Sequence, residues 1–359
     1  MTYQLRRRGA FLSLGIVGAL LFSACGGSDE SSDGSGGSGG DSTPVAGADG
    51  GECTMDSLYE AAQDEGTLVR WGGQDPEDMA VVYDAFSQEY PGIEIQDAVV
   101  NPDETPTRLL TERSAGNAPP DLFQGRVSFL KPLIDAGALN QDPGWADCGA
   151  RDEIIQADGG LTENVQPWAL AYNTDEVSPD DLPSSWEDLA DEKYQGMMSV
   201  DPRGFPFDML ALTLGADGAV DLVTSLKETV DPTLTQGGTA GLAEVASGEI
   251  AIRPALVPDI KASQADGAPV DFVYLDPVLV LNDAIYMPEG VEHPNAAMLF
   301  ALWYAAEDGG QAITRERNFR DNSPPSDIPD GVETVAAETA EDADEVVTAN
   351  QEIVGIWGG

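Results

Sequence analysis

Apolar and polar residues alternate with two different periods along most of this chain. Residues 67–71 form a short apolar run that predicts a strand. Asp75 and Pro76 favour the start of a helix, because Asp caps helices and Pro suits their first position. Apolar residues then recur at helical spacing as far as Phe86, and Pro91 ends this helix. A strand followed by an amphipathic helix is therefore the first predicted unit.

The same pattern continues through the rest of the chain. Strands are predicted at residues 93–100, 121–123, 197–200, 248–252, 271–275 and 278–281, and helices at 186–189, 207–214 and 296–306, with one more from Thr105. Residues 331–359 are helical and acidic, with Trp357 as a docking side chain. Strands that alternate with helices indicate an α/β fold with doubly wound, parallel sheet. Roughly 300 residues suit two domains.

The N-terminus predicts export. Three arginines, at positions 6 to 8, precede an apolar run at 10–22 that is too short for a membrane span. Residues 21–25, which end in Cys25, resemble the cleavage site of a bacterial lipoprotein, with Phe22 where Leu is usual. We therefore expect a lipoprotein signal peptide at 1–24 and acylation of Cys25. An ordinary signal peptide cut nearby, or twin-arginine export, are the alternatives.

Residues 25–52 are almost all Gly, Ser, Asp, Ala and Thr. Such a segment buries too little apolar surface to offset chain entropy, so it predicts a disordered tether. The whole chain has 17 basic and 64 acidic residues, a net charge of -47. A polyanion of this size repels nucleic acid and anionic headgroups, which excludes both as ligands. The acidity by itself indicates a well-solvated surface rather than a cationic ligand.

Cysteine and histidine usage narrows the chemistry. If Cys25 carries lipid, Cys53 and Cys148 remain, and an oxidising compartment favours a disulfide between them over two free thiols. His293 is the single histidine, so no metal site built on several histidines is available. The sequence also lacks a Gly-x-Ser-x-Gly elbow and a His-Glu-x-x-His motif. We expect no enzyme activity, no cofactor and no metal, although paired carboxylates leave a secreted hydrolase open.

Several segments together resemble the extracellular solute-binding proteins of ABC importers, in the group that contains ferric-iron, thiamine and polyamine binders. The matching segments are 65–69, 85–86, 90–94, 120–122, 171–175, 182–189, 194–196, 247–249, 293–297 and 310–311. Their order spans nearly the whole body of the chain.

The resemblance implies a two-lobe fold like that of periplasmic binding proteins of type II. Each lobe would hold a doubly wound sheet, and two crossing strands near 168–173 and 275–286 would join them. Lobe one would comprise 53–167 with about 277–318, and lobe two 168–276 with about 319–359. A small solute would bind in the cleft and pass to a permease and its ATPase. The protein would be a monomer on the outer face of the cytoplasmic membrane, exposed to the periplasm or the exterior.

Loops that follow strands are the candidates for the cleft, because ligands of open α/β sheets lie at the carboxyl ends of the strands. The candidate ligand-binding residues are Trp71, Gly73, Gln74, Gln124, Arg126, Trp168, Tyr172, Arg203, Phe205, Gly238, Thr239, Arg253, Asn282 and Asp283. Asp75 is a helix cap, and Trp71 suits either the core or the cleft. Arg203 would pair with a neighbouring carboxylate or hold a ligand carboxylate or phosphate.

The class of ligand stays open at this point. Asp283 with the aromatic residues suits a polyamine-like cation, whereas Arg203, Arg253 and the glycine loops suit an organic anion or a phosphorylated compound. Ferric-iron members of the group typically use adjacent tyrosines, and no Tyr-Tyr pair occurs here. The same binding fold would also serve a sensor that reports ligand to a membrane receptor.

Overall fold

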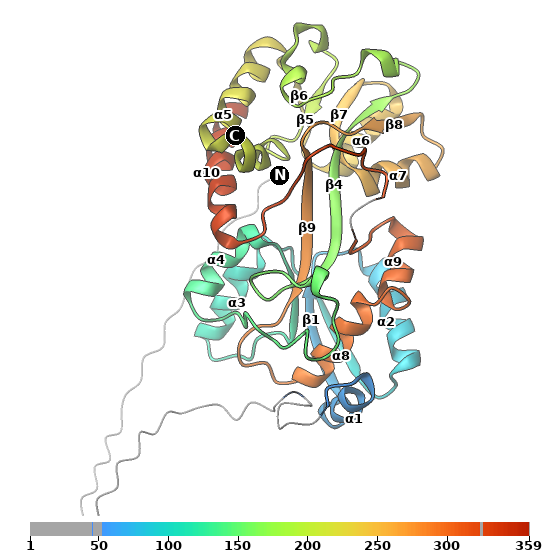
Figure 1. Cartoon of the computed structure of the whole chain (residues 1–359), viewed down its shortest axis with the longest axis vertical. Coiled ribbons are helices and arrows are strands. Elements are labelled where there is room, and N and C mark those ends of the chain that lie inside the picture. The colour runs from blue at the N-terminus through green and yellow to red at the C-terminus, as the bar shows by residue number, and fades with distance from the viewer. Residues whose placement is uncertain (1–44, 46–51, 324–325, 359) are drawn as a thin grey trace, which may run out of the picture. The chain divides into compact units, whose positions relative to one another are not determined.

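The computed structural model describes residues 45, 52–323 and 326–358, which belong to one unit of the chain. The expected signal peptide, Cys25 and nearly all of the expected tether lie outside these residues. The first part of the described chain alternates helices and strands as predicted (Figure 1). Its elements are α1 (Met55–Glu65), β1 (Thr67–Gly72), α2 (Pro76–Glu89), β2 (Glu94–Val99), α3 (Thr105–Ser114), β3 (Leu122–Gly125) and α4 (Val127–Asp135).

The local chemistry of α2 shows why these elements form where they do. The Asp75 carboxylate accepts a hydrogen bond from the Glu77 amide, and Pro76 occupies the first turn. Met79, Val82 and Phe86 are buried on one face of α2, as their spacing predicts. The strands β2, β1 and β3 then pair in parallel in that order.

Two long strands connect this part of the molecule to the next. They are β4 (Leu161–Asn173) and β9 (Val278–Tyr286). They pair with each other antiparallel over most of β9, and Figure 1 shows them side by side between two groups of elements. Near its start β4 pairs only with β9, and from Trp168 onward it pairs with β7 and β8. One end of β9 pairs with β3. The strand order is β2-β1-β3-β9-β4-β7.

The second group of elements follows β4. It contains β5 (Ser199–Val200), α5 (Ala211–Thr229), β6 (Thr233–Leu234), α6 (Gly238–Ser247), β7 (Ile252–Leu256), α7 (Val257–Ala265) and β8 (Val270–Val273). After β9 the chain forms α8 (Pro294–Ala305), α9 (Gly310–Asn318), β10 (Thr334–Val335) and α10 (Ala340–Trp357). We call α1–α4 with α8 and α9 the first lobe, and β5–β8 with α5–α7 the second lobe. The predicted boundary residues of the lobes stay predictions.

Each lobe has its own buried apolar core. In the first lobe the ring of Phe86 lies edge-on to Phe300 and Trp303, with centroids 5.1 and 5.3 Å away. In the second lobe Phe207 contacts Trp186, with centroids 5.9 Å apart, and Trp357, at 6.5 Å. Such aromatic contacts contribute about 0.5–1.5 kcal/mol each beyond the area that they bury. The predicted docking role of Trp357 is confirmed, since its side chain is 2% exposed.

The C-terminal helix α10 contacts both lobes. It packs along α5 of the second lobe and against α4 of the first (Figure 1). Ala343 joins the buried cluster of the first lobe, whereas Val346 and Ile353 join that of the second. The Asn350 amide donates to the carbonyl oxygen of Arg203 at 2.7 Å. The last helix therefore holds a loop of the second lobe in place while it packs on the first.

Cys53 and Cys148 form a disulfide in the structure, with their Cα atoms 4.8 Å apart. This is the pair that cysteine usage favours. Both cysteines pack against the buried core of the first lobe. The bond closes a loop with a sequence separation of 95 residues around most of that lobe.

Three details of the predicted fold need correction. The large sheet is mixed: β1, β2 and β3 pair in parallel, as do β9 and β10, but β9 pairs antiparallel with β3 and with β4, and β4 pairs antiparallel with β7 and β8. The helix expected at 186–189 is a single 3-10 turn, Glu187–Ala190, because the Asp188 carboxylate accepts the amides of Ser184 and Ser185 and the chain becomes extended at Asp191. The helix expected at 207–214 begins as a 3-10 turn and breaks at Gly215, whose φ of 71° is left-handed.

Candidate functional site

Two adjoining cavities lie where loops from both lobes meet the crossing strands. The first, which we call the Trp168 cavity, has a volume of about 270 Å³. The second, the Gln74 cavity, has a volume of about 540 Å³. Both are lined by Arg126, Phe129, Arg203, Phe205 and Leu256. Because they share these residues, we treat them as one cleft.

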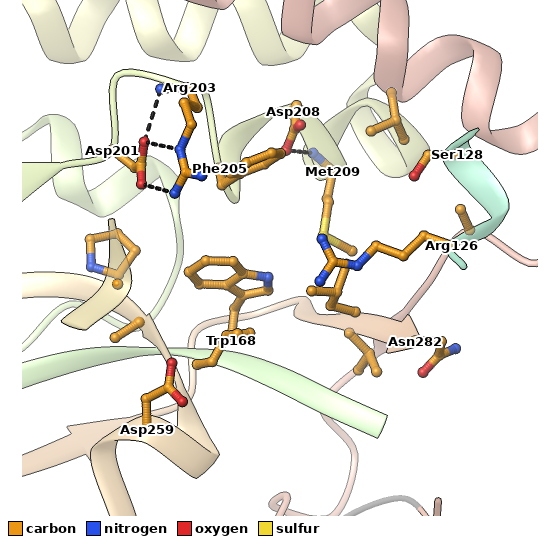
Figure 2. A pocket seen from close by; sticks show the side chains of 18 of the residues that line it. Arg126, Ser128, Trp168, Asp201, Arg203, Phe205, Asp208, Met209, Asp259 and Asn282 are labelled. Atoms are coloured by element: carbon orange, nitrogen blue, oxygen red, sulfur yellow. Dashed lines mark hydrogen bonds and ion pairs between the residues drawn. The ribbon is translucent and has the colours of Figure 1, made fainter. Parts of the chain in front are cut away.

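Each part of the fold contributes one wall of the cleft. From the first lobe, Arg126, Ser128 and Phe129 come from the start of α4, directly after β3. From the second lobe, the loop after β5 contributes Arg203 and Phe205. Trp168 on β4 and Asn282 on β9 come from the crossing strands; Figure 2 shows Trp168 and Arg126 pointing into the same space. A bound molecule would therefore touch both lobes at once.

Arg203 and Asp201 form a bidentate ion pair in the wall of the second lobe (Figure 2). Arg203 Nε donates to Asp201 Oδ1 at 3.0 Å, and Nη2 donates to Oδ2 at 2.7 Å. Burial alone would raise the pKa of Asp201, but hydrogen bonds from Arg203 and from the Gly237 amide lower it below its ordinary value. Hydrogen bonds to Asp201 also raise the pKa of Arg203. Asp201 is thus ionised and fixes the direction of the Arg203 fork.

Arg126 forms the matching ion pair on the other side of the cleft. Its Nε donates to Asp283 Oδ1 on β9 at 2.5 Å, and Gln166 Nε2 of β4 donates to Asp283 Oδ2 at 2.8 Å. The Asp283 side chain is 6% exposed, whereas that of Arg126 is 27% exposed. The carboxylate therefore anchors the arginine from behind and leaves the guanidinium facing the cavity.

Arg253 lies deeper in the wall of the second lobe. Arg253 is 2% exposed. Its Nη1 donates to Ser199 Oγ at 3.0 Å, and its Nη2 donates to the Thr235 carbonyl at 2.9 Å. Burial lowers the pKa of Arg253. A Cβ atom on Gly241 would lie 2.0 Å from Arg253 Cζ, so only glycine there leaves room for the guanidinium. The fold is therefore shaped around this cation.

Two carboxyl groups in the cleft hold their protons more tightly than usual. Asp208 is 2% exposed, and burial raises its pKa to about 7 although Asn350 and the Met209 amide donate hydrogen bonds to it. Burial also raises the pKa of Asp259, opposed by Arg320, whose Nη2 lies 3.2 Å from Asp259 Oδ1. Asp208 is therefore partly protonated at neutral pH, whereas Asp259 has a cationic partner in Arg320.

A buried polar network supports the Gln74 side of the cleft. Arg70 is 1% exposed and donates to Gln74 Oε1 at 2.7 Å and to the Tyr83 hydroxyl at 3.0 Å. Glu163 accepts a hydrogen bond from Gln74 Nε2 and pairs with Arg70 at 3.5 Å. Burial opposes the charge on Arg70, but Tyr83, Glu163 and Asp97 raise its pKa overall. The network fixes the Gln74 amide at the cleft surface.

Most of the predicted candidates meet in this cleft. Gly73, Gln74, Gln124, Arg126, Arg203, Phe205 and Asp283 line the Gln74 cavity, and Arg126, Trp168, Arg203, Phe205, Gly238, Arg253 and Asn282 line the Trp168 cavity. The rule that ligand-binding loops follow strands accounts for residues 73, 74, 126 and 203, whereas residues 282 and 283 reach the cleft from within β9. That these residues bind a ligand remains a proposal.

Three candidates lie outside both cavities, so their predicted place in the cleft needs correction. Trp71 is 7% exposed and packs in the first-lobe core, with the Arg108 guanidinium 4.3 Å above its ring. Tyr172 is 5% exposed and packs in the second-lobe core, because it lies further along β4 than Trp168, on the same face but beyond the cavity. Thr239 is exposed in the first turn of α6.

Sequence reasoning missed several residues of the cleft. They are Ser128, Phe129, Asp201, Asp208, Met209, Asp259, Gln166 and Arg320, among others. Asp201 had a local signal, since it stands two residues before Arg203 in the same loop. Arg320 and Asp259 come from distant segments, and only the fold brings them to the site.

A two-lobe α/β fold with crossing strands and a cleft between the lobes is that of a type II periplasmic binding protein. Residues 82–327 match the family of bacterial extracellular solute-binding proteins, which is more than half of the chain. The chain therefore belongs to this family, whose members bind solutes outside the cell. No curated protein sequence matches the chain significantly.

Solved structures share the fold at low sequence identity. Iron-bound HitA from Pseudomonas aeruginosa is 19% identical with a TM-score of 0.67, over 80% of this chain and 99% of that one. A ferric binding protein from Campylobacter jejuni is 13% identical with a TM-score of 0.66, over 80% and 99% of the two chains. An ABC-transporter substrate-binding protein from Bradyrhizobium japonicum USDA 110 is 16% identical with a TM-score of 0.66, over 82% and 100%. At such identities the likeness concerns the fold alone.

Proposed function

We propose that this protein is a lipid-anchored, monomeric substrate-binding protein that captures a small solute in its cleft and delivers it to a membrane permease. The observation that carries the proposal is the lining of the cleft by both lobes together with the crossing strands. Capture of this kind requires no covalent chemistry, since the ligand is released unchanged to the permease.

The arrangement supports capture by closure. A ligand that contacts Arg126 on one lobe and Arg203 on the other stabilises the state in which both approach it. The crossing strands β4 and β9 are the covalent links between the lobes at this point, so a small change in their dihedral angles would open the cleft. Binding would in this way select the closed state that a permease recognises.

Capture and import are tested together on the purified protein and on the producing cells. The protein is incubated with a small-molecule extract of culture medium, and bound compounds are identified by mass spectrometry after denaturation. Ser128→Trp should abolish capture, because the indole would fill the Trp168 cavity, whereas Thr239→Trp, at an exposed position outside both cavities, should not. Cells that lack the protein should then lose uptake of the captured compound.

Two results would contradict this proposal. Failure of the wild-type protein to retain any compound would contradict solute capture. Retention without any change in uptake, combined with loss of a transcriptional response to the compound, would favour a sensing role instead.

Acylation is tested separately at Cys25, which resembles the modified cysteine of bacterial lipoproteins. Cys25→Ala should release the protein from the membrane fraction into the medium or periplasm, and mass spectrometry of the wild-type N-terminus should show the added acyl chains. A wild-type protein that is soluble and begins at another residue would exclude the anchor.

A further inference from the structure

The cleft gathers a large share of the arginines of a strongly acidic protein, beside seven aspartates that also line it. Only 14 lysines and arginines follow the signal region, and four of these line the two cavities: Arg126, Arg203, Arg253 and Arg320. They come from both lobes and from the segment after α9, so the tertiary structure gathers cations that are far apart in the sequence.

These guanidinium groups keep donors available for a ligand. Within the described residues, no hydrogen bond or ion pair involves Nη1 or Nη2 of Arg126, Nη1 of Arg203 or Nη1 of Arg320. The side chains of these three are 27%, 49% and 30% exposed, so the free N–H groups are accessible. Arginine donors of this kind match the oxygen atoms of carboxylates and phosphoryl groups.

Other donors point to the same chemistry. Trp168 Nε1 and Arg253 Nε are buried and have no hydrogen-bond partner among the described residues. The start of α4 lines the Trp168 cavity at Val127 and Ser128 and carries the positive end of the helix dipole. Asn282 Oδ1 is the unpartnered buried acceptor among the residues of this cavity. Asn164 Oδ1, in the Gln74 cavity, is a second such acceptor, so the preference for an anion rests mainly on the accessible donors of Arg126, Arg203 and Arg320.

Most carboxylates of the cleft have partners of their own. Asp201 and Asp283 each accept hydrogen bonds from an arginine and from a second donor. Burial raises the pKa of Asp208 to about 7, and Asp259 pairs with Arg320 at 3.2 Å. Asp75 and Asp103 line the Gln74 cavity at exposed positions, and Asp78 pairs with Arg317.

We propose, on the basis of the proposed function, that the ligand is a small organic oxyanion with a carboxylate or phosphoryl group. Its oxygen atoms lie between Arg126 of the first lobe and Arg203 of the second, and its apolar body lies against Trp168, Phe205 and Met209 (Figure 2). No tyrosine lines either cavity among the described residues, so the walls favour an organic anion over a metal held by phenolate oxygens. The anion would also draw the two lobes together through the two arginines.

The test compares four probes that share one ring and differ in charge. Thermal unfolding of the purified protein is followed against phenylphosphonate, phenylacetate, phenylacetamide and phenethylamine at constant ionic strength. The two anions should raise the midpoint temperature with saturation, and the amide and amine should not. Stabilisation by phenethylamine alone, or by none of the four, overturns the oxyanion assignment.

Variants locate the effect. Arg203→Met and Arg126→Met should each weaken anion binding roughly tenfold to a hundredfold, because each removes hydrogen bonds to a charged group. Arg315→Met removes one exposed positive charge outside both cavities and should leave binding unchanged. Trp168→Phe keeps most of the packing and deletes one donor, so it tests the site even if an arginine variant fails to fold. Equal binding by wild type, Arg203→Met and Trp168→Phe would place the anion elsewhere and refute the proposal.

The outcome is separable from that of the proposed function. If the capture experiment retains a cationic or neutral solute, the binding role stands and the oxyanion assignment fails. If the wild-type protein retains no compound from the extract, and cells that lack the protein take up solutes as before, the binding role itself fails.

Discussion

Asp208 should make the stability of this protein depend on pH in a way that one substitution removes. Its side chain is 2% exposed, and within the described residues it forms no ion pair. Its oxygens accept hydrogen bonds from the Met209 amide and from Asn350 Nδ2, both at 2.9 Å. Burial in this setting outweighs those bonds and raises the pKa from 3.8 to about 7. The folded protein therefore binds a proton that the unfolded chain releases.

The sign and size of the effect follow from this difference. Because the folded pKa is the higher one, the contribution of Asp208 to stability is fully present below pH 3.8 and is lost as the pH rises through about 7. Each pH unit inside this window is worth about 1.4 kcal/mol. Between about pH 5 and pH 7.5 the free energy of unfolding should fall by roughly 2.5 kcal/mol through this group alone.

Asp208→Asn isolates this contribution. Urea unfolding followed by tryptophan fluorescence gives the free energy of unfolding of both proteins from pH 5 to 7.5. The amide can change the free energy of unfolding by an amount that does not depend on pH. From pH 5 to pH 7.5, however, the wild-type protein should lose roughly 2.5 kcal/mol more than the variant does. Asp221→Asn, at an exposed position on α5, controls for the loss of one negative charge from the chain. A difference that stays constant with pH for Asp208→Asn would refute a raised pKa at this site.

Two further predictions concern the first lobe. Replacing Cys53 and Cys148 together by serine should lower the free energy of unfolding by about 4.7 kcal/mol, because loop-closure entropy gives this value for a separation of 95 residues. In urea unfolding, reducing the disulfide of the wild-type protein should lower its free energy of unfolding by a similar amount. Equal stability of the two redox states would contradict this. Arg70→Met should cost roughly 3–5 kcal/mol because it leaves the Glu163 carboxylate buried without its cation. Adding Glu163→Gln to Arg70→Met should restore much of the lost stability, because the buried carboxylate is then removed as well. If the two changes in free energy of unfolding simply add, Arg70 and Glu163 are not energetically coupled.

Much of this protein is determined by local sequence. The Asp75–Pro76 start of α2 and the helical spacing of Met79, Val82 and Phe86 predict that helix and its buried face, because capping and periodicity depend on near neighbours. The alternation of strands and helices predicts the α/β class for the same reason. The placement of candidate residues in loops after strands brings most of them to the cleft, since the carboxyl ends of strands share one edge of a sheet.

Tertiary structure decided what near neighbours do not determine. The antiparallel course of β9 beside β3 and β4 depends on pairing between segments over a hundred residues apart, which no local period records. The ion pair of Arg126 with Asp283 spans 157 positions, and it joins the residue that precedes α4 to a residue of β9 in one wall of the site. Trp71 and Tyr172 became core residues because the faces of their strands point inward. The raised pKa of Asp208 likewise comes from the burial that packing imposes, since ionisation responds to the surrounding dielectric and partners rather than to sequence position.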